Sequence, residues 1–187
     1  MPELMRVAKK YGLTVIEDAT EALGTKYTEG EYAGRMAGTI GDIGVYSFNG
    51  NKIITTGSGG MVVSNHSDWL EHARHKSDEL NYLHDEVGYN YRLTNLQAAL
   101  GLAQMEQLES FIAHKNAMYH FYFERLNGKH GYGIMPFRAG VRSNKWFYSL
   151  YVSDECPLRR DDVIRALAAE KIQTRPIWGL IQDQADY

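Results

Sequence analysis

The residues with the clearest chemical potential are a lysine on a glycine-rich loop and a carboxylate at the end of an apolar run. Lys52 follows the run 44–48 and a short polar turn, and it precedes two threonines and a cluster of glycines. Upstream, Asp18 closes the apolar run 13–17. A lysine on a tight loop can form a Schiff base, and an acid can pair with a pyridinium nitrogen. Together with a nearby hydroxyl, these are the parts needed to hold pyridoxal phosphate (PLP).

Each of the two residues also has an ordinary explanation. Asp18 could be a helix N-cap or a loop carboxylate, and most lysines are solvated surface charges. In the chemical interpretation, Asp18 would keep the pyridine nitrogen of PLP protonated, because a nearby opposite charge favours the charged form. Lys52 would carry the cofactor and later move a proton between carbon atoms. A lysine acts as such a base only when burial or neighbouring cations disfavour its charged form.

Three blocks extend this pattern over the first half of the chain. The first is 15–24, which reads Val-Ile-Glu-Asp-Ala-Thr-Glu-Ala-Leu-Gly. The second is 41–61, from Gly-Asp-Ile-Gly through the lysine loop, and the third is 86–101, with Gly-Tyr-Asn-Tyr-Arg near its start. In order and spacing the blocks resemble the DegT/DnrJ/EryC1/StrS family of PLP-dependent sugar aminotransferases. The resemblance implies an α/β fold, fold type I of the PLP-dependent transferases, with a partial large-domain sheet and a small α+β C-terminal domain.

The resemblance also implies roles for residues near the cofactor. Lys52 would be the Schiff-base lysine, Asp18 the partner of the ring nitrogen, and Ser47 a donor to the phosphate. Ser47 could equally be a strand-end hydroxyl that is satisfied by backbone. Glu21 departs from many relatives, which carry glutamine at this position over the cofactor ring. The glutamate places a second acid near PLP.

Three further residues are candidates on the same ground. Asn90 resembles the asparagine that reaches across a dimer to the neighbouring subunit's PLP phosphate. The resemblance therefore implies a homodimer with shared active sites. Arg92 could favour an anionic ligand or simply brace its loop, and Arg175 could face the nucleotide sugar. The histidines show no metal-ligand spacing, so no metal site is expected.

Composition limits the alternatives. The 187 residues are 44% hydrophobic and 12% aromatic, which is ample for a packed core in one or two domains. A net charge of −3 gives no reason to expect a nucleic-acid or anionic-membrane partner. The single cysteine, Cys156, excludes an internal disulfide and fits a reducing cytoplasm.

Hydrophobic periodicity and turn residues predict the elements that must position these side chains. Strands that alternate with helices in the first half favour an α/β sheet covered on both faces. A change of composition near Asn127 predicts a partial PLP-binding large domain with connecting helices over 1–127 and a partial small domain over 128–187. Helices are expected over 3–11, 67–76, 94–108, 110–126 and 159–171. Strands are expected over 13–17, 43–48, 61–64, 131–136, 145–152 and from 172 to 176.

The function expected from this pattern is transfer of an amino group, with glutamate as donor, to a nucleotide-linked 4-keto-6-deoxy sugar for surface polysaccharide or glycan biosynthesis. A dehydratase of the same family is a weaker alternative, because those members replace the lysine with histidine. A non-catalytic regulatory homologue and an inert fragment are the others. Family members carry a long segment before the equivalent of Met1, with the glycine-rich turn that holds the PLP phosphate. We therefore expect the chain to be a fragment that is not a competent enzyme alone.

Overall fold

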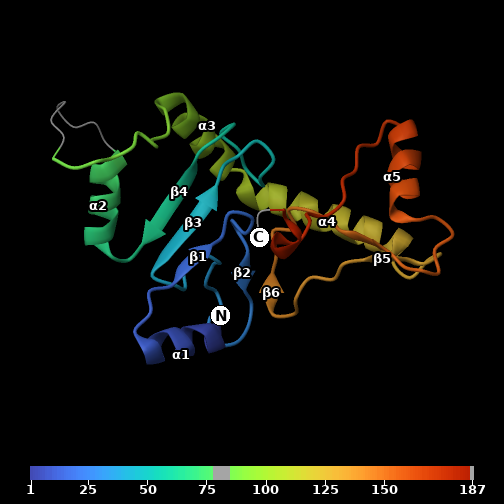
Figure 1. Ribbon diagram of the computed structural model, residues 1–187, viewed down its shortest axis with the longest axis horizontal. Coiled ribbons are helices and arrows are strands. Elements are labelled where there is room, and N and C mark those ends of the chain that lie inside the picture. Colours follow the sequence, from blue (N-terminus) through green and yellow to red (C-terminus); the bar gives the residue numbers. More distant parts are fainter. Residues whose placement is uncertain (78–84, 186–187) are drawn as a thin grey trace. The chain divides into compact units, whose positions relative to one another are not determined.

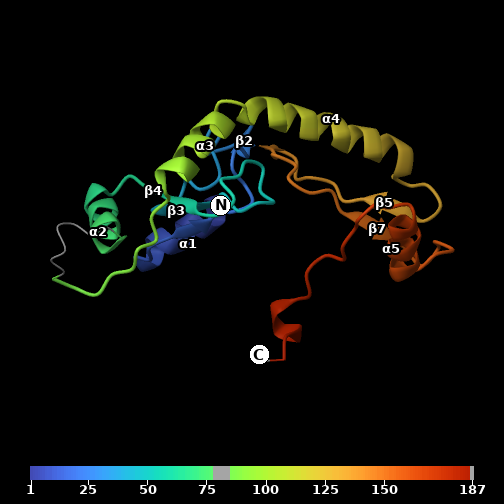
Figure 2. The same ribbon diagram turned by 90° about the horizontal axis from the view of Figure 1, so that it is seen from above.

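The computed structural model of the chain describes residues 1–77 and 85–185 (Figure 1). These residues form two compact units. The first unit comprises residues 1–117 and 137–146, and the second comprises 118–136 and the residues from 147 onward. The chain first passes between the units inside the long helix α4, earlier in the sequence than the boundary predicted near Asn127 (Figure 2). It then returns once to the first unit.

The first unit holds the motif blocks. Its elements, in chain order, are α1 (Pro2–Tyr11), β1 (Ile16–Asp18), β2 (Lys26–Tyr27), β3 (Ile43–Ser47), β4 (Gly60–Ser64), α2 (Ser67–Ser77), α3 (Asn95–Met105), the start of α4 (Leu108–Leu126), and β6 (Val141–Arg142).

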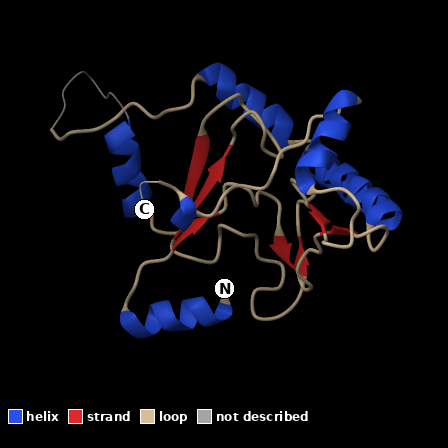
Figure 3. Ribbon diagram, turned by 45° about the vertical axis from the view of Figure 1, so that its right-hand side comes forward, coloured by secondary structure: helices blue, strands red, loops and turns tan. Residues whose placement is uncertain are grey.

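Three of these strands form one sheet in the order β1-β3-β4, as labelled in Figure 1. Figure 3 shows the strands in red and the helices in blue. Strand β1 runs parallel to β3, with Asp18 opposite Val45, and β4 runs antiparallel to β3. Strands β2 and β6 form a separate antiparallel pair in which Lys26 lies opposite Arg142. The return of the chain to the first unit therefore places residues 137–146 beside the segment that follows β1.

Capping residues explain where several helices begin and end. Helix α1 ends at Gly12, whose φ of 63° is the left-handed conformation that glycine adopts without a steric penalty. Helix α3 begins after Thr94, which forms a capping box with Gln97. Helix α4 is followed by Gly128 with a φ of 72°. These ends confirm the predicted end of the first helix at residue 11, the predicted start of a helix at residue 94, and the predicted end of α4 at residue 126.

The hydrophobic core of the first unit lies where β3, the loop after β1 and α4 meet. Its buried residues come from all three segments, and Ile54 is only 1% exposed. Because the core joins the segment after β1 to the end of β3, it fixes the two chain segments that carry the candidate site. The cluster consists of Ala19, Leu23, Tyr46, Phe48, Ile54, Leu108 and Ile112.

A carboxylate on β1 fixes the loop that precedes β3. Glu17 accepts hydrogen bonds from the backbone N–H groups of Gly38, Ile40 and Gly41, at 2.9, 2.5 and 2.5 Å. Successive side chains of a strand point to opposite faces. The alternation therefore directs Glu17 toward this loop and leaves its neighbour Asp18 for the other side.

The second unit is built on the end of α4 and a two-stranded sheet. Strands β5 (Tyr132–Ile134) and β7 (Leu150–Val152) are antiparallel, and α5 (Arg160–Ala169) and the 3-10 turn η2 (Ile181–Asp183) follow. Ile134 is buried, and its backbone N–H donates to Asn127 Oδ1 at 2.9 Å. The side chains of Tyr119, Tyr122, Phe123 and Tyr148 form an aromatic cluster on α4 and the segment before β7.

Three predicted strands differ from the structure. The strand predicted over 13–17 is shorter and later, and it is not buried, because Leu13 and Ile16 are 60% and 63% exposed. Of the strand predicted over 145–152, only Leu150–Val152 is extended and paired. The last strand, predicted from 172, is wrong: residues 172–180 adopt no regular structure. In each case the apolar and β-branched pattern favoured a longer strand, but residues 13–15, 145–149 and 172–176 lie outside the paired strands of the described chain.

The expected burial on both faces of the sheet is also not met by the described residues. Met61 and Val62 of β4 are 46% and 50% exposed, and α3 buries none of its residues although Leu96 and Leu100 follow its apolar period. Periodicity predicts which side of an element is apolar, but it does not supply the element that covers it. Within the part of the chain that the structure describes, every helix falls short of the length and apolarity that a bilayer span requires.

We expect Glu17→Gln to lower the free energy of unfolding by about 1–3 kcal/mol, because hydrogen bonds to a charged acceptor are lost and an amide N–H is turned toward backbone donors. Chemical denaturation followed by circular dichroism measures the loss. Glu71→Gln, on the exposed surface of α2, is the matched control and should change stability little. Equal effects of the two substitutions would contradict the anchoring role of Glu17.

Candidate active site

The candidate site lies at the carboxyl ends of β1 and β3, which are neighbours and parallel. Asp18 is the last residue of β1, and Ser47 is the last residue of β3. Lys52 follows on a tight turn in which its backbone N–H donates to Asn49 O at 3.0 Å. Ligands of α/β proteins bind outside the carboxyl ends of such strands. The parallel register therefore brings the first two motif blocks to one place.

The amine of Lys52 is held between an acid and an aromatic ring. Its Nζ lies 3.3 Å from Glu21 Oε1 and 4.1 Å from the ring centroid of Trp146. The Lys52 side chain is only 13% exposed, whereas that of Glu21 is 51% exposed. The solvated-surface alternative for Lys52 is therefore wrong, since a largely buried ammonium has two specific partners.

Asp18 is arranged to stay ionised. Its Oδ1 accepts a hydrogen bond from the Thr20 backbone N–H at 3.1 Å. Hydrogen bonding by the side chain and then the backbone of Thr20, together with the positive charge of Lys52, lowers the pKa of the Asp18 carboxyl. Asp18 is exposed and makes no ion pair with Lys52, whose ion pair is with Glu21. The site therefore offers an exposed carboxylate beside a shielded amine.

Ser47 makes the backbone contact that its sequence context left open. Its Oγ accepts a hydrogen bond from the Asn49 backbone N–H at 3.2 Å. A hydroxyl that accepts one hydrogen bond still has its own proton to donate. Ser47 is half-buried at the end of β3, so it keeps the capacity to donate to an anionic group.

The remaining predicted residues lie on other segments of the described chain. Asn90 is exposed on the segment before α3, and its Oδ1 accepts from the Arg92 backbone N–H at 3.5 Å. Arg92 is exposed on the same segment. Arg175 is exposed in the second unit. Within this chain, the structure brings together Asp18, Glu21, Ser47 and Lys52.

Two residues at the site were missed by the sequence reasoning. Asn144 and Trp146 follow β6 within residues 137–146, the segment that returns to the first unit. The Asn144 amide nitrogen donates to Glu21 O at 2.9 Å and to Leu23 O at 3.0 Å. The Trp146 Nε1–H donates to Asn51 O at 2.5 Å, next to Lys52. They lie far along the chain from the motif blocks, and Trp146 fell within the strand predicted over 145–152, so no signal in the sequence pointed to either residue.

The chain belongs to the DegT/DnrJ/EryC1/StrS aminotransferase family, whose model matches residues 1–187. The protein EpsN of Bacillus subtilis (strain 168) is 39% identical over 98% of this chain and 47% of its own length. The GDP-perosamine synthase of Escherichia coli O157:H7 is 38% identical over 95% of this chain and 48% of its own length.

A solved structure agrees with the fold. The crystal structure of a DegT DnrJ EryC1 StrS aminotransferase from Brucella abortus superposes with a TM-score of 0.83 and 26% identity, over 100% of this chain and 48% of that chain. The α/β fold expected from the resemblance is thereby confirmed. This chain spans about half the length of the curated relatives it matches.

The position of Thr20 generates a test of the ionised state of Asp18. Thr20→Val removes the hydroxyl, the largest cause of the lowered pKa, and should raise the pKa of Asp18 toward its ordinary value. Thr20→Ser keeps the hydroxyl and should leave the pKa where it is. Carboxyl-carbon NMR titration of Asp18 measures both. A valine variant that titrates like the parent would show that the hydroxyl does not hold the charge.

Proposed function

We propose that this protein is a PLP-dependent aminotransferase that transfers an amino group to a nucleotide-linked 4-keto-6-deoxy sugar, with glutamate as the amino donor. The observation that carries the proposal is the largely buried amine of Lys52 at the carboxyl ends of β1 and β3, within a chain that matches an aminotransferase family from end to end. The name of the Escherichia coli relative, GDP-perosamine synthase, supports a nucleotide sugar as substrate. We further propose a cytoplasmic enzyme of surface polysaccharide or glycan biosynthesis.

The groups at the site fit the cofactor. PLP presents an aldehyde, a ring nitrogen and a phosphate, and the site supplies an amine, an ionised carboxylate and a hydroxyl with a free proton. Lys52 would link the aldehyde carbon through Nζ. Asp18 would face the ring nitrogen, and Ser47 would donate to the phosphate.

In the mechanism that follows, PLP supplies an electron sink for bond breaking at the carbon that carries the amino group. Asp18, whose pKa is lowered by Thr20 and Lys52, would hold the proton on the ring nitrogen. Lys52 Nζ would be the base that moves a proton between the two carbon atoms on either side of the transferred nitrogen. Glu21 orients the lysine amine while no substrate is bound.

The assignment of Lys52 predicts where PLP reacts with this chain. After incubation with saturating PLP and borohydride reduction, peptide mass spectrometry should find the phosphopyridoxyl group on Lys52. Lys115 and Lys145 are internal controls, since burial lowers the pKa of both amines although neither belongs to the candidate site. Lys52→Arg should remove the label and leave that of the controls unchanged. A folded chain labelled equally at all three lysines would sink the cofactor assignment and favour a non-catalytic homologue.

We also propose a homodimer in which Asn90 completes the partner's phosphate site, as two-fold symmetry allows. Asn90→Ala should then weaken PLP labelling of Lys52 by about tenfold or more, the cost of one hydrogen bond to a charged group. Mixing this variant with Lys52→Arg chains, which keep Asn90, should restore labelling of the Asn90→Ala chain.

The matched control is a chain that carries both Lys52→Arg and Asn90→Ala. It can form the same mixed dimers, but it supplies no asparagine, so it should restore nothing. If the two mixtures label the Asn90→Ala chain equally while size-exclusion chromatography shows mixed dimers, Asn90 does not act across the interface.

A further inference from the structure

The aromatic partner of Lys52 lies outside the motif blocks. Trp146 is 7% exposed, and the Lys52 Nζ sits 4.1 Å from its ring centroid. An ammonium within about 6 Å of an aromatic centroid is attracted by the negative face of the ring, more strongly when both groups are shielded from water. For comparison within the first unit, Lys10 lies over Tyr11 at 5.1 Å and Lys145 over Phe137 at 5.6 Å, both at longer range.

The indole is itself fixed at several points. Its Nε1–H donates to Asn51 O, and its backbone N–H donates to Asn144 Oδ1 at 3.1 Å. Asn144 is 3% exposed and holds the backbone of Glu21 through its amide nitrogen. The ring therefore contacts both the head of Lys52 and the turn that carries it. The acid and the ring that flank the amine are tied to each other through one buried asparagine.

The contacts of the buried Trp146 ring are more specific than apolar packing requires. Trp146 is not among the residues of the hydrophobic core cluster around Phe48 and Ile54. Its polar edge bonds the residue before Lys52, and its face takes the charged end of Lys52. A lysine side chain has several rotatable bonds whose freedom is lost when its amine is held in one place. A rigid ring under the amine reduces the range of positions that the amine samples before it reacts.

We propose that Trp146 is a positioning residue for Lys52, which holds the ε-ammonium against Glu21 and sets the direction from which the amine meets the cofactor. The proposal rests on the function proposed for Lys52, but the contact itself exists without any cofactor. It can therefore be measured separately from PLP chemistry.

The first readout is the NMR signal of the Lys52 side chain in the cofactor-free chain. In a sample labelled with ¹³C-lysine, the Hε protons of Lys52 should lie upfield of those of the exposed lysines, because they lie over the face of the indole. Lys52→Arg assigns the signal by removing it. In Trp146→Leu the Lys52 Hε chemical shift should return to the range of the exposed lysines. Trp146→Phe keeps an aromatic ring and should retain part of the upfield shift.

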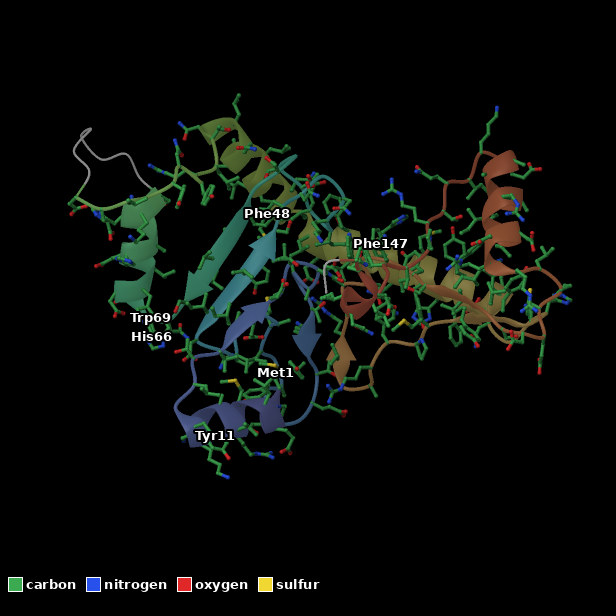
Figure 4. All side chains as sticks on the ribbon, in the orientation of Figure 1. Met1, Tyr11, Phe48, His66, Trp69 and Phe147 are labelled. Carbon is green, nitrogen blue, oxygen red and sulfur yellow. The ribbon has the colours of Figure 1, made fainter. Side chains whose placement is uncertain are left out.

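Trp69→Leu is the matched control. Trp69 belongs to the first unit and stacks on His66 with ring centroids 4.1 Å apart, near the start of α2 (Figure 4). Its removal also deletes one indole and should leave the Lys52 signal in place. Amide spectra of each variant show whether the chain remains folded, and Trp146→Phe provides the test if the leucine variant does not.

The second readout is PLP labelling of Lys52 at a fixed, subsaturating PLP concentration. Trp146→Leu should lower it by about ten- to thirtyfold, the range expected when a lysine side chain regains its rotamer freedom and its amine is no longer held in one place, while labelling of Lys115 stays unchanged. An unshifted Lys52 signal in the parent chain would overturn the proposal. The proposal would also fail if neither the Lys52 signal nor the labelling of Lys52 changed in Trp146→Leu. A shifted Lys52 signal that depends on Trp146, with no phosphopyridoxyl group on Lys52 at any PLP concentration, would instead overturn the proposed function.

Discussion

The candidate site depends on one buried amide. The Asn144 side chain satisfies the carbonyls of Glu21 and Leu23, and its backbone N–H donates to Thr25 Oγ1 at 3.0 Å. A buried acceptor that loses its partner costs about 1–3 kcal/mol, so these bonds hold the returning segment firmly on the loop after β1. Trp146 and Glu21 are thereby placed on either side of the Lys52 amine. The chemistry of the motif blocks thus rests on a residue that belongs to none of them.

The short strand β1 carries two adjacent acids, one that stabilises the fold and one that belongs to the candidate site. Glu17 and Asp18 are adjacent, and strand alternation points them to opposite faces. The Glu17 carboxylate accepts hydrogen bonds from the backbone amides of the loop at 38–41, so its role is structural. Asp18 keeps an exposed carboxylate at the strand's carboxyl end. Because β1 is parallel to β3, that end is also where the Lys52 turn begins.

Local signals predicted the parts of this fold that local physics decides. Gly12 and Thr94 mark helix ends because a left-handed residue or a side-chain cap acts within one turn. The order of the motif blocks located Asp18 and Lys52. Burial was predicted less well, as exposed Ile16 shows, because an apolar pattern does not reveal what covers it. Trp146 could not be found from spacing, since a contact over ninety-odd residues follows from the tertiary fold alone.

The site contains two carboxylates and one ammonium, and their geometry assigns the partners. Glu21 pairs with Lys52 at 3.3 Å, so the positive charge is already compensated before any ligand arrives. Asp18 is left with Thr20 as its hydrogen-bond partner and only a longer-range attraction to Lys52. A glutamine in place of Glu21 would leave Asp18 as the main counter-charge of the lysine. The glutamate therefore frees Asp18 for a second cation, and a protonated ring nitrogen is the cation that the proposed cofactor would bring.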